Sequence, residues 1–373
     1  MKILIYTLPF KENFGGILQA FALQEVLKEE GHQVTFLNRR QERKPRILEQ
    51  TVWLKWNLSE RIIGKCGIMS YMPFFGVLPF KNRYLNVSQI FFQRDKIIEF
   101  CKKMNFEGYI VGSDQIWRYD FVPDIRDSFL YFAKDMDAVK LSYAASFGSD
   151  EWNYPAEYQK ICAQLIQQFA LVTVREDSGV ELCRKHLGCE AFSVLDPTLL
   201  LRKEQYEKVI EENDTHKSKG IFCYMLDNTP YKEKIVTTIK ESLGLSEFRM
   251  SCSHSLVEFI RNFRNGIKQT VPQWLSNFSN ADFVITDSFH GTVFSIIFNK
   301  PFVTIANKER GMARFCSLLS KFGLQDRLLT ESGFSHLEKI LKEPVDWDSV
   351  NSKREELAAY SKQLLFSSLN INE

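Results

Sequence analysis

The chain has 373 residues, of which 45% are hydrophobic and 25% charged, a composition that excludes a disordered chain and predicts two domains. A formal net charge of +2 without a long run of one sign excludes the electrostatic footprint of a nucleic-acid-binding protein. The eight cysteines form no C-x-x-C pair and the six histidines lack ligand spacing, so we expect neither a disulfide framework nor a metal site. Reduced cysteines, a first apolar run too short for a signal peptide and the lack of a membrane-spanning stretch predict a cytoplasmic protein.

The first half of the chain alternates short apolar runs with helical stretches, which is the pattern of a parallel sheet covered by helices. We predict strands at residues 2–7, 33–37, 109–111, 140–144, 171–174 and 192–195. The aromatic and basic stretch from about 38 to 105 lacks a clean alternation, so we interpret it as an insertion of two or three helices that walls a cleft. A first Rossmann-like domain is therefore predicted over residues 1–205.

The second half repeats this alternation after the polar stretch 211–220, which we interpret as a linker. Strands are predicted at residues 221–226, 247–251, 282–285 and 302–305. They predict a second Rossmann-like domain over residues 206–345. Helical periodicity from 347 to 365 predicts a terminal helix within residues 346–373 that packs back on the first domain.

The turn Asp287-Ser288-Phe289-His290-Gly291 joins a predicted strand to a predicted helix and carries the clearest functional signal. In open α/β sheets ligands bind beyond the carboxyl ends of strands, so this turn is expected at a cleft. His290 can exchange a proton near neutral pH, Gly291 lets the backbone approach a ligand, and the helix N-terminus suits an anion. The structural alternative is a histidine that only caps the helix.

Two earlier turns carry polar groups at strand ends. In Asn13-Phe14-Gly15-Gly16 the glycines could present backbone N–H groups to an anion or a sugar. The motif is not G-x-G-x-x-G, so a dinucleotide site has little support, and the alternative is a tight turn. In Gly112-Ser113-Asp114-Gln115-Ile116-Trp117 a carboxylate, an amide and an indole are the groups that line sugar sites, and the alternative is an Asp cap over a buried Trp.

Arg175 ends another predicted strand, where its guanidinium could hold a carboxylate or phosphate in a bidentate manner. The alternative is a surface pair with Glu176 or Asp177. Asp196-Pro197-Thr198 closes the last strand of the first domain, and we interpret it as a structural turn.

Taken in order, these turns resemble the motifs of the polysaccharide pyruvyl transferase family over roughly residues 3 to 320. The motifs are Asn13-Phe14-Gly15-Gly16, Gly112-Ser113-Asp114-Gln115-Ile116-Trp117, Ser146-Phe147-Gly148, Val174-Arg175-Glu176, Asp196-Pro197-Thr198 and Ser288-Phe289-His290-Gly291. The resemblance implies an α/β fold with two Rossmann-like domains facing a cleft, as in GT-B glycosyltransferases. It also implies phosphoenolpyruvate as a co-substrate without a further cofactor, a sugar diol of a surface polysaccharide or its lipid-linked precursor as acceptor, and a pyruvate ketal and phosphate as products.

The resemblance also assigns candidate residues. The family's donor-binding Arg falls on Arg175 and its active-site His on His290, while Asp114 and Asp287 are candidate bases. Ser288 stands where the family has the Arg of an Arg-x-His pattern, so Arg310 or Arg314 is expected to supply that cation. The expected donor site therefore comprises Arg175, Ser288, Gly291, Arg310 and Arg314, and the expected acceptor or anion site comprises Asn13, Gly15, Gly16, Ser113, Gln115 and Trp117.

Two other functions stay open at this point. A glycosyltransferase that uses a nucleotide sugar would share the two-domain cleft, and the Ser at the Arg position favours it. A catalytically silent glycan-binding protein is the third reading. A lipid-linked acceptor would bring the protein to the inner face of the membrane, and the sequence names neither the acceptor sugar nor the oligomeric state.

Overall fold

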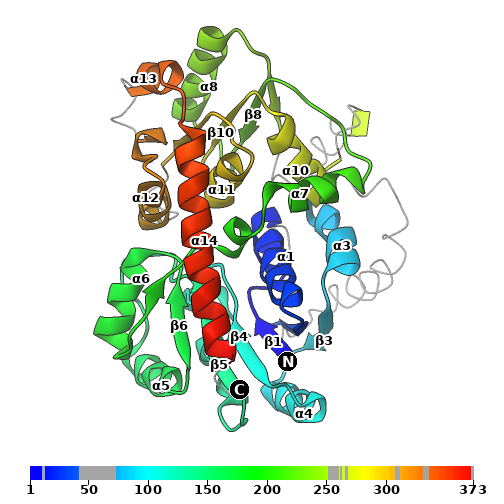
Figure 1. Ribbon diagram of the computed structural model, residues 1–373, viewed down its shortest axis with the longest axis vertical. Coiled ribbons are helices and arrows are strands. Elements are labelled where there is room, and N and C mark those ends of the chain that lie inside the picture. The colour runs from blue at the N-terminus through cyan, green and yellow to red at the C-terminus, as the bar shows by residue number, and fades with distance from the viewer. Residues whose placement is uncertain are drawn as a thin grey trace, which may run out of the picture.

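Two fully parallel β-sheets form the two halves of the molecule (Figure 1). The computed structural model describes residues 1–10, 13–41, 73–250, 260, 263–264, 268–306, 311–330 and 336–370. The first sheet has the order β3-β2-β1-β4-β5-β6-β7 and the second the order β12-β11-β10-β8-β9. The strands are β1 (Lys2–Tyr6), β2 (Gln33–Arg39), β3 (Val87–Phe91), β4 (Gly108–Val111), β5 (Val139–Ala145), β6 (Leu171–Val174), β7 (Phe192–Ser193), β8 (Ile221–Tyr224), β9 (Glu247–Arg249), β10 (Phe283–Thr286), β11 (Phe302–Ile305) and β12 (Leu328–Leu329).

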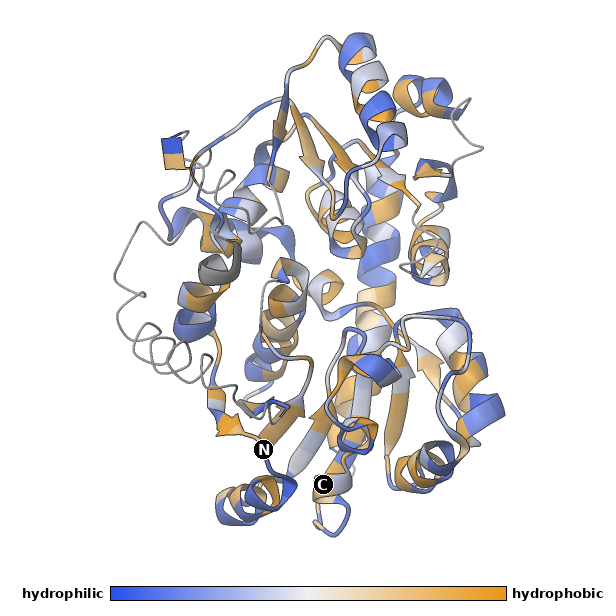
Figure 2. Cartoon of the chain, turned by 180° about the vertical axis from the view of Figure 1, so that it is seen from behind, coloured by the Kyte–Doolittle hydropathy of each residue, from blue (hydrophilic) through white to orange (hydrophobic). Residues whose placement is uncertain are grey.

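Helices cover both sheets, and the strands at the sheet centres are therefore mostly apolar. In Figure 2 hydrophobic colour predominates in several of these strands and pale residues interrupt it, and every residue of β4, β6, β8, β10 and β11 is buried. The helices are α1 (Phe14–Glu29), α3 (Pro73–Tyr84), α4 (Arg94–Met104), α5 (Ala156–Ile166), α6 (Asp177–Leu182), α7 (Lys203–Glu211), α8 (Pro230–Leu243), α10 (Val271–Asn280), α11 (Phe289–Ile297), α12 (Met312–Lys321), α13 (Leu337–Lys342) and α14 (Trp347–Leu369). A π-helical turn, Cys183–Leu187, follows α6, and short 3₁₀ helices are η2 (Tyr119–Phe121), η3 (Ile125–Phe129), η4 (Tyr131–Ala133), η6 (Pro197–Leu200) and η8 (Gln325–Arg327).

The region predicted as an insertion contributes a regular strand and helix to the first sheet. β3 pairs in parallel with β2, with Phe36 opposite Val87, and α4 then leads back to β4. β3 is an edge strand in which only Phe91 is buried, so it lacks the continuous apolar run that identifies the other strands. Residues 42–72, the rest of the predicted insertion, lie outside the described part of the chain.

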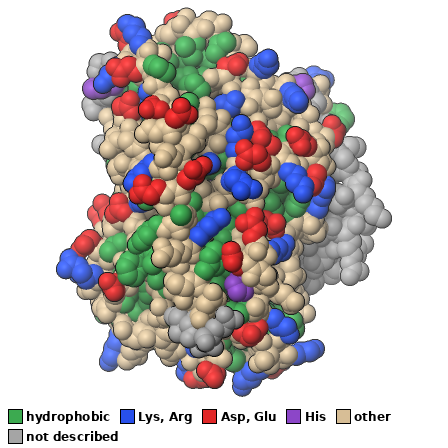
Figure 3. All heavy atoms as spheres, viewed as in Figure 1, with side chains coloured by type: hydrophobic (Ala, Val, Ile, Leu, Met, Phe, Trp, Pro, Cys, Tyr) green, Lys and Arg blue, Asp and Glu red, His purple; other side chains and the backbone are tan. Residues whose placement is uncertain are grey.

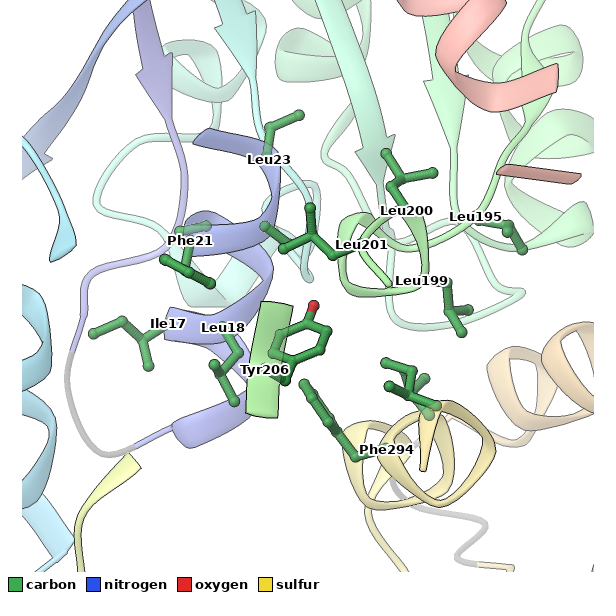
Figure 4. Close-up of a cluster of buried hydrophobic side chains, with 14 of the residues drawn as sticks. Ile17, Leu18, Phe21, Leu23, Leu195, Leu199, Leu200, Leu201, Tyr206 and Phe294 are labelled. Carbon is green, nitrogen blue, oxygen red and sulfur yellow. The ribbon is translucent and has the colours of Figure 1, made fainter. Parts of the chain in front are cut away.

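A shared hydrophobic core joins the two halves. Most residues of α1 are buried, because the helix packs both on the first sheet and against the second half. The Phe14 ring lies 6.1 Å from the Trp274 ring, and Tyr206 of α7 lies 5.0 Å from Phe294 of α11. Figure 4 shows Tyr206 and Phe294 beside the leucines of η6 and the apolar face of α1. The halves are therefore held in a fixed relation on this side.

The C-terminal helix α14 runs along both halves (Figure 1). It packs against η6, β5 and β6 of the first half, and Leu195 N–H donates to Ser361 Oγ at 3.2 Å. No helix within the described residues is long and apolar enough to cross a membrane. On the face shown in Figure 3, basic and acidic side chains are interspersed over both halves.

Candidate active site

A cavity of about 520 Å³ lies where the strand order of both sheets reverses. Strands β1 and β4 flank the reversal in the first sheet, and β8 and β10 flank it in the second. The turns that follow these four strands all reach the cavity, which is where ligands bind in open α/β sheets. The first half contributes Asn13, Asp114, Gln115, Arg118 and Phe121, and the second half contributes Tyr224, Leu226, Asp287, Ser288, Phe289, His290, Arg314 and Phe315.

The carboxylate of Asp114 is presented to the cavity by a constrained turn. Its backbone φ of 70° lies in the left-handed region, which costs energy for a residue other than glycine. The turn is held because the Asp114 carbonyl accepts from Ser146 N–H at 3.0 Å and from Ile116 N–H at 2.7 Å. Asn13, the N-cap of α1, donates from Nδ2 to Asp114 Oδ2 at 3.3 Å. The geometry therefore fixes an acidic group on the first-half wall.

His290 crosses from the second half to the first. It is the second residue of α11, whose N-cap is Ser288 with Oγ accepting from Gly291 N–H at 3.3 Å, so the histidine does not serve as the cap. His290 Nε2 lies 3.6 Å from Asp196 Oδ2. A Cβ built on Gly15 would lie 2.2 Å from the imidazole ring, so only glycine leaves room for His290 at this point. The glycines of the first turn thus accommodate a side chain of the other half.

Gly15→Ala is therefore expected to displace His290. The added methyl group overlaps the ring, and such overpacking costs roughly 1–3 kcal/mol of stability. Urea unfolding measures this loss. Gly108→Ala is the matched control, since its added methyl group would meet its neighbours at 3.4 Å or more. Equal stability of the two variants would contradict the packing of His290 against Gly15.

Arg175 lies behind the cavity wall and is 4% exposed. Its Nη1 donates to Asp196 Oδ2 at 2.9 Å, and its Nη2 lies 3.6 Å from Asp114 Oδ1. Glu176 Oε2 is 4.0 Å from its Nε, and the Phe289 ring centroid is 4.4 Å from its guanidinium carbon. Arg175 is thus surrounded by three carboxylates and covered by Phe289. Arg175 is not among the residues that line the cavity, and its guanidinium faces these acids, so its role in binding the donor stays a prediction.

Asp196 connects Arg175 and His290. Its Oδ2 also accepts from Ser113 Oγ at 3.3 Å, and its Oδ1 accepts from Thr198 Oγ1 at 2.7 Å. Burial raises the pKa of Asp196, but His290 and Arg175 outweigh it and hold the pKa well below its usual range. The sequence favoured a structural turn at this position. The signal that could have identified Asp196 as a site residue is its position just after the short strand β7, at the same carboxyl ends of the strands as the other turns.

Arg314 supplies a cation on the second-half wall. It lies in the first turn of α12, and burial together with nearby Arg175 lowers the pKa of Arg314 to about 10, so it stays charged at neutral pH. A Cβ on Gly311, just before α12, would lie 2.4 Å from the Gly148 carbonyl oxygen, which fixes the start of α12 against the first half. Arg314 and Ser288 line the same cavity, and the replacement of the missing Arg by Arg314 stays a prediction. Arg310, the other suggested replacement, lies outside the described residues.

Asp287 and Gly291 have structural partners, and their roles in catalysis and donor binding stay predictions. Asp287 reaches the cavity, but its Oδ2 pairs with Lys232 Nζ at 2.5 Å and its Oδ1 accepts from Leu226 N–H at 2.7 Å. A Cβ on Gly291 would lie 2.2 Å from Thr286 Oγ1, so this glycine lets α11 pack on β10. Within the described residues, no group of three or more His, Cys, Asp or Glu side chains could hold a metal ion.

Some of the residues expected to bind the acceptor line the cavity, and others are buried in the protein interior. Asn13 and Gln115 line the cavity, whereas Trp117 is fully buried, donates from Nε1 to the Ser128 carbonyl at 2.9 Å and stacks on Phe129. Gly16 packs beside Asn13, and Ser113 is buried under Asp196. Five further lining residues, whose contributions to the wall depend on the tertiary fold, had no signal in the sequence: Arg118, Phe121, Tyr224, Leu226 and Phe315.

The two facing Rossmann-like halves and the cavity between their strand ends define an α/β enzyme of the GT-B-like class. The model of the polysaccharide pyruvyl transferase family matches residues 13–309, and the chain belongs to this family. No curated protein matches the sequence.

Solved structures with the same fold include two UDP-GlcNAc 2-epimerases. The enzyme from Methanocaldococcus jannaschii is 13% identical, with 92% of each chain covered and a TM-score of 0.53. The UDP-N-acetylglucosamine 2-epimerase from Rickettsia bellii is 10% identical, with 100% of this chain and 96% of that chain covered and a TM-score of 0.52. At such identities the likeness concerns the fold alone.

Proposed function

We propose that the protein transfers the pyruvyl group of phosphoenolpyruvate to a sugar diol of a surface polysaccharide or its lipid-linked precursor, forming a pyruvate ketal and releasing phosphate. The observation that carries the proposal is a cavity with His290 and Arg314 on one wall and Asp114 on the other. A lipid-linked acceptor would place this reaction at the inner face of the membrane, and the donor is a co-substrate rather than a bound cofactor.

The reaction needs an acid, a base and a site for anions. One sugar hydroxyl adds to C2 of the enol phosphate while the methylene carbon takes up a proton and becomes the methyl group. The second hydroxyl then forms the other C–O bond at C2, and the bond from C2 to the phosphate oxygen breaks. Of the two hydroxyl protons, one balances the new C–H bond and the other leaves with phosphate.

The second-half wall suits the donor. Arg314 can hold the phosphate or carboxylate of phosphoenolpyruvate by charge-assisted hydrogen bonds. The N-terminus of α11, which starts at the cavity with Ser288 and Phe289, adds N–H groups and the positive end of the helix dipole. Arg175 supports this wall from behind, since Phe289 stacks on its guanidinium.

Acid and base then fall to His290 and Asp114. The Asp196 carboxylate beside His290 can orient the imidazole and stabilise a positive charge on it, which fits a proton donor to the methylene carbon. Asp114 faces the cavity from the opposite half and fits the base that accepts a hydroxyl proton. Asp287 is a weaker candidate for this task because Lys232 already pairs with it.

The test is phosphate release from phosphoenolpyruvate across a panel of lipid-linked and free saccharides. We expect release that depends on one saccharide, with a ketal detected in the product by mass spectrometry. A parallel panel of nucleotide sugars tests the glycosyltransferase alternative, which would release a nucleoside diphosphate instead. Saccharide-dependent thermal stabilisation without turnover of either donor would point to a glycan-binding protein.

Arg314→Gln is expected to weaken the binding of phosphoenolpyruvate by about 10- to 150-fold, because a hydrogen bond to a charged group contributes about 1.5–3 kcal/mol. Isothermal titration calorimetry measures the dissociation constant directly. Arg184→Gln is the control, since Arg184 is an exposed partner of Glu181 outside the cavity. Unchanged affinity in Arg314→Gln would move the anion site away from α12.

A further inference from the structure

We propose that the first-half wall of the cavity holds a saccharide subsite built on the ring of Phe121, with a pyranose stacking on this ring. The inference rests on the proposed function and names the acceptor site within it. Phe121 ends the short helix η2, lines the cavity and is 43% exposed. An exposed aromatic ring in the wall of a cavity that also presents amide and charged side chains offers the apolar surface that ligand sites combine with a few polar groups.

The ring of Phe121 packs against the guanidinium of Arg118, whose charge is neutralised by Asp120. The guanidinium carbon of Arg118 lies 4.2 Å from the ring centroid, and Arg118 Nε donates to Asp120 Oδ1 at 3.0 Å. One face of the ring is therefore occupied by Arg118, and we infer that the other face is the one available to a ligand. Because Arg118 and Asp120 cancel in charge, this part of the wall favours a neutral ligand over an anion.

The neighbouring polar groups match the hydroxyls of a sugar. Arg118 Nη1 reaches Gln115 Oε1 at 3.5 Å, and Gln115 and Asp114 line the same wall. A pyranose has an apolar face of C–H groups and an equatorial rim of hydroxyls, so it can stack on Phe121 while its rim meets the amide and carboxylate. The second-half wall, with Arg314 and His290, suits the anionic donor instead. The two walls therefore divide the substrates by charge.

Saturation-transfer difference NMR tests the subsite without requiring turnover. The probes are the methyl pyranosides of glucose, galactose and mannose, each added to the wild-type protein. We expect saturation of the ring C–H protons of at least one probe, its loss in Phe121→Ala and its retention in Phe92→Ala. Phe92 is a matched control because its side chain is 36% exposed and lies outside the cavity lining. No saturation with the wild type, or saturation that survives Phe121→Ala, overturns the subsite.

Kinetics separate this inference from the proposed transferase activity. With the saccharide that supports phosphate release, Phe121→Ala should raise the KM for the saccharide about tenfold, leave the KM for phosphoenolpyruvate unchanged, and be rescued by Phe121→Trp. An unchanged saccharide KM together with phosphate release rejects the subsite but keeps the transferase. Saturation that depends on Phe121, with no phosphate release from phosphoenolpyruvate in the presence of any lipid-linked or free saccharide of the panel, keeps the subsite and rejects the transferase.

Discussion

Arg175→Met is expected to lower the free energy of unfolding by about 3–5 kcal/mol at neutral pH, because removing one partner of a buried ion pair leaves the other charge uncompensated. Arg175 is the cation that Asp114, Glu176 and Asp196 share in the core of the site. The methionine side chain fills most of the same space, so the loss reports charge rather than a cavity. Urea unfolding followed by circular dichroism measures it.

The pH dependence of this loss has a defined sign. In the wild type the pKa of Asp196 is held below its unfolded value of about 3.9, so its contribution to stability is complete above that value and is lost as the pH falls through the folded pKa. Without Arg175 the pKa of Asp196 rises and this contribution shrinks. The free energy of unfolding of the wild type should therefore exceed that of Arg175→Met by the whole amount at pH 7, and by less below about pH 4.

Arg118→Met is the matched control for this experiment. Arg118 also pairs with a carboxylate, but its side chain and that of Asp120 are 31% and 56% exposed, so the pair should contribute about 0–1 kcal/mol. If Arg175→Met were no more destabilising than Arg118→Met, the ion pairs of Arg175 with its three carboxylates would not stabilise the fold. A difference in stability that did not change with pH would assign the loss to packing.

The central strands of both sheets were predictable because burial on two faces requires continuous apolar runs. β1, β4, β6 and β11 lie within a residue or two of the predicted ranges. β3 and β12 were missed, since β3 buries only one of its five residues and β12 is only two residues long. The other two edge strands, β7 and β9, begin at the predicted residues 192 and 247 and end two residues earlier than predicted. The fold class was therefore readable from the sequence, whereas two of the four edge strands were not.

The candidate site was predictable only as far as strand ends could be located. His290, Asp114 and Asn13 were found because each follows a strand that flanks a reversal of strand order. The burial of Arg175 and Trp117 depends on residues far away in sequence, such as Phe289 over the guanidinium, and no local pattern records such contacts. Gly15 illustrates the same limit, since a glycine is required there by the ring of His290, which comes from the other half of the chain.

The site is also fixed by contacts between the halves on its other side. Asp177 Oδ2 accepts from Ser317 Oγ at 3.0 Å, and Lys321 Nζ lies 2.9 Å from Asp177 Oδ1. These bonds anchor α12 to α6, while the aromatic core around Trp274 anchors α1. Two separate sets of contacts therefore hold the second half, which carries Arg314 and His290, against the first half.

His290→Ala is expected to lower kcat for phosphate release by about 10²–10⁴-fold, which is the usual size of general acid–base catalysis. The chain should remain folded, because Ser288 rather than His290 caps α11. His186→Ala is the control, since His186 stacks on Trp152 away from the cavity. A rate near that of the wild type in His290→Ala would remove the histidine from the chemistry.

Asp196→Asn tests whether Asp196 and His290 act together in catalysis. The amide keeps the shape of the side chain but removes the charge beside the imidazole, so kcat should fall in the otherwise wild-type protein. In a His290→Ala background the same substitution should have little further effect on kcat, because residues that act together lose their contributions non-additively. Comparing kcat for the wild type, both single variants and the double variant gives the coupling between them. Independent, multiplicative losses would show that Asp196 serves Arg175 and the fold but not the proton transfer at His290.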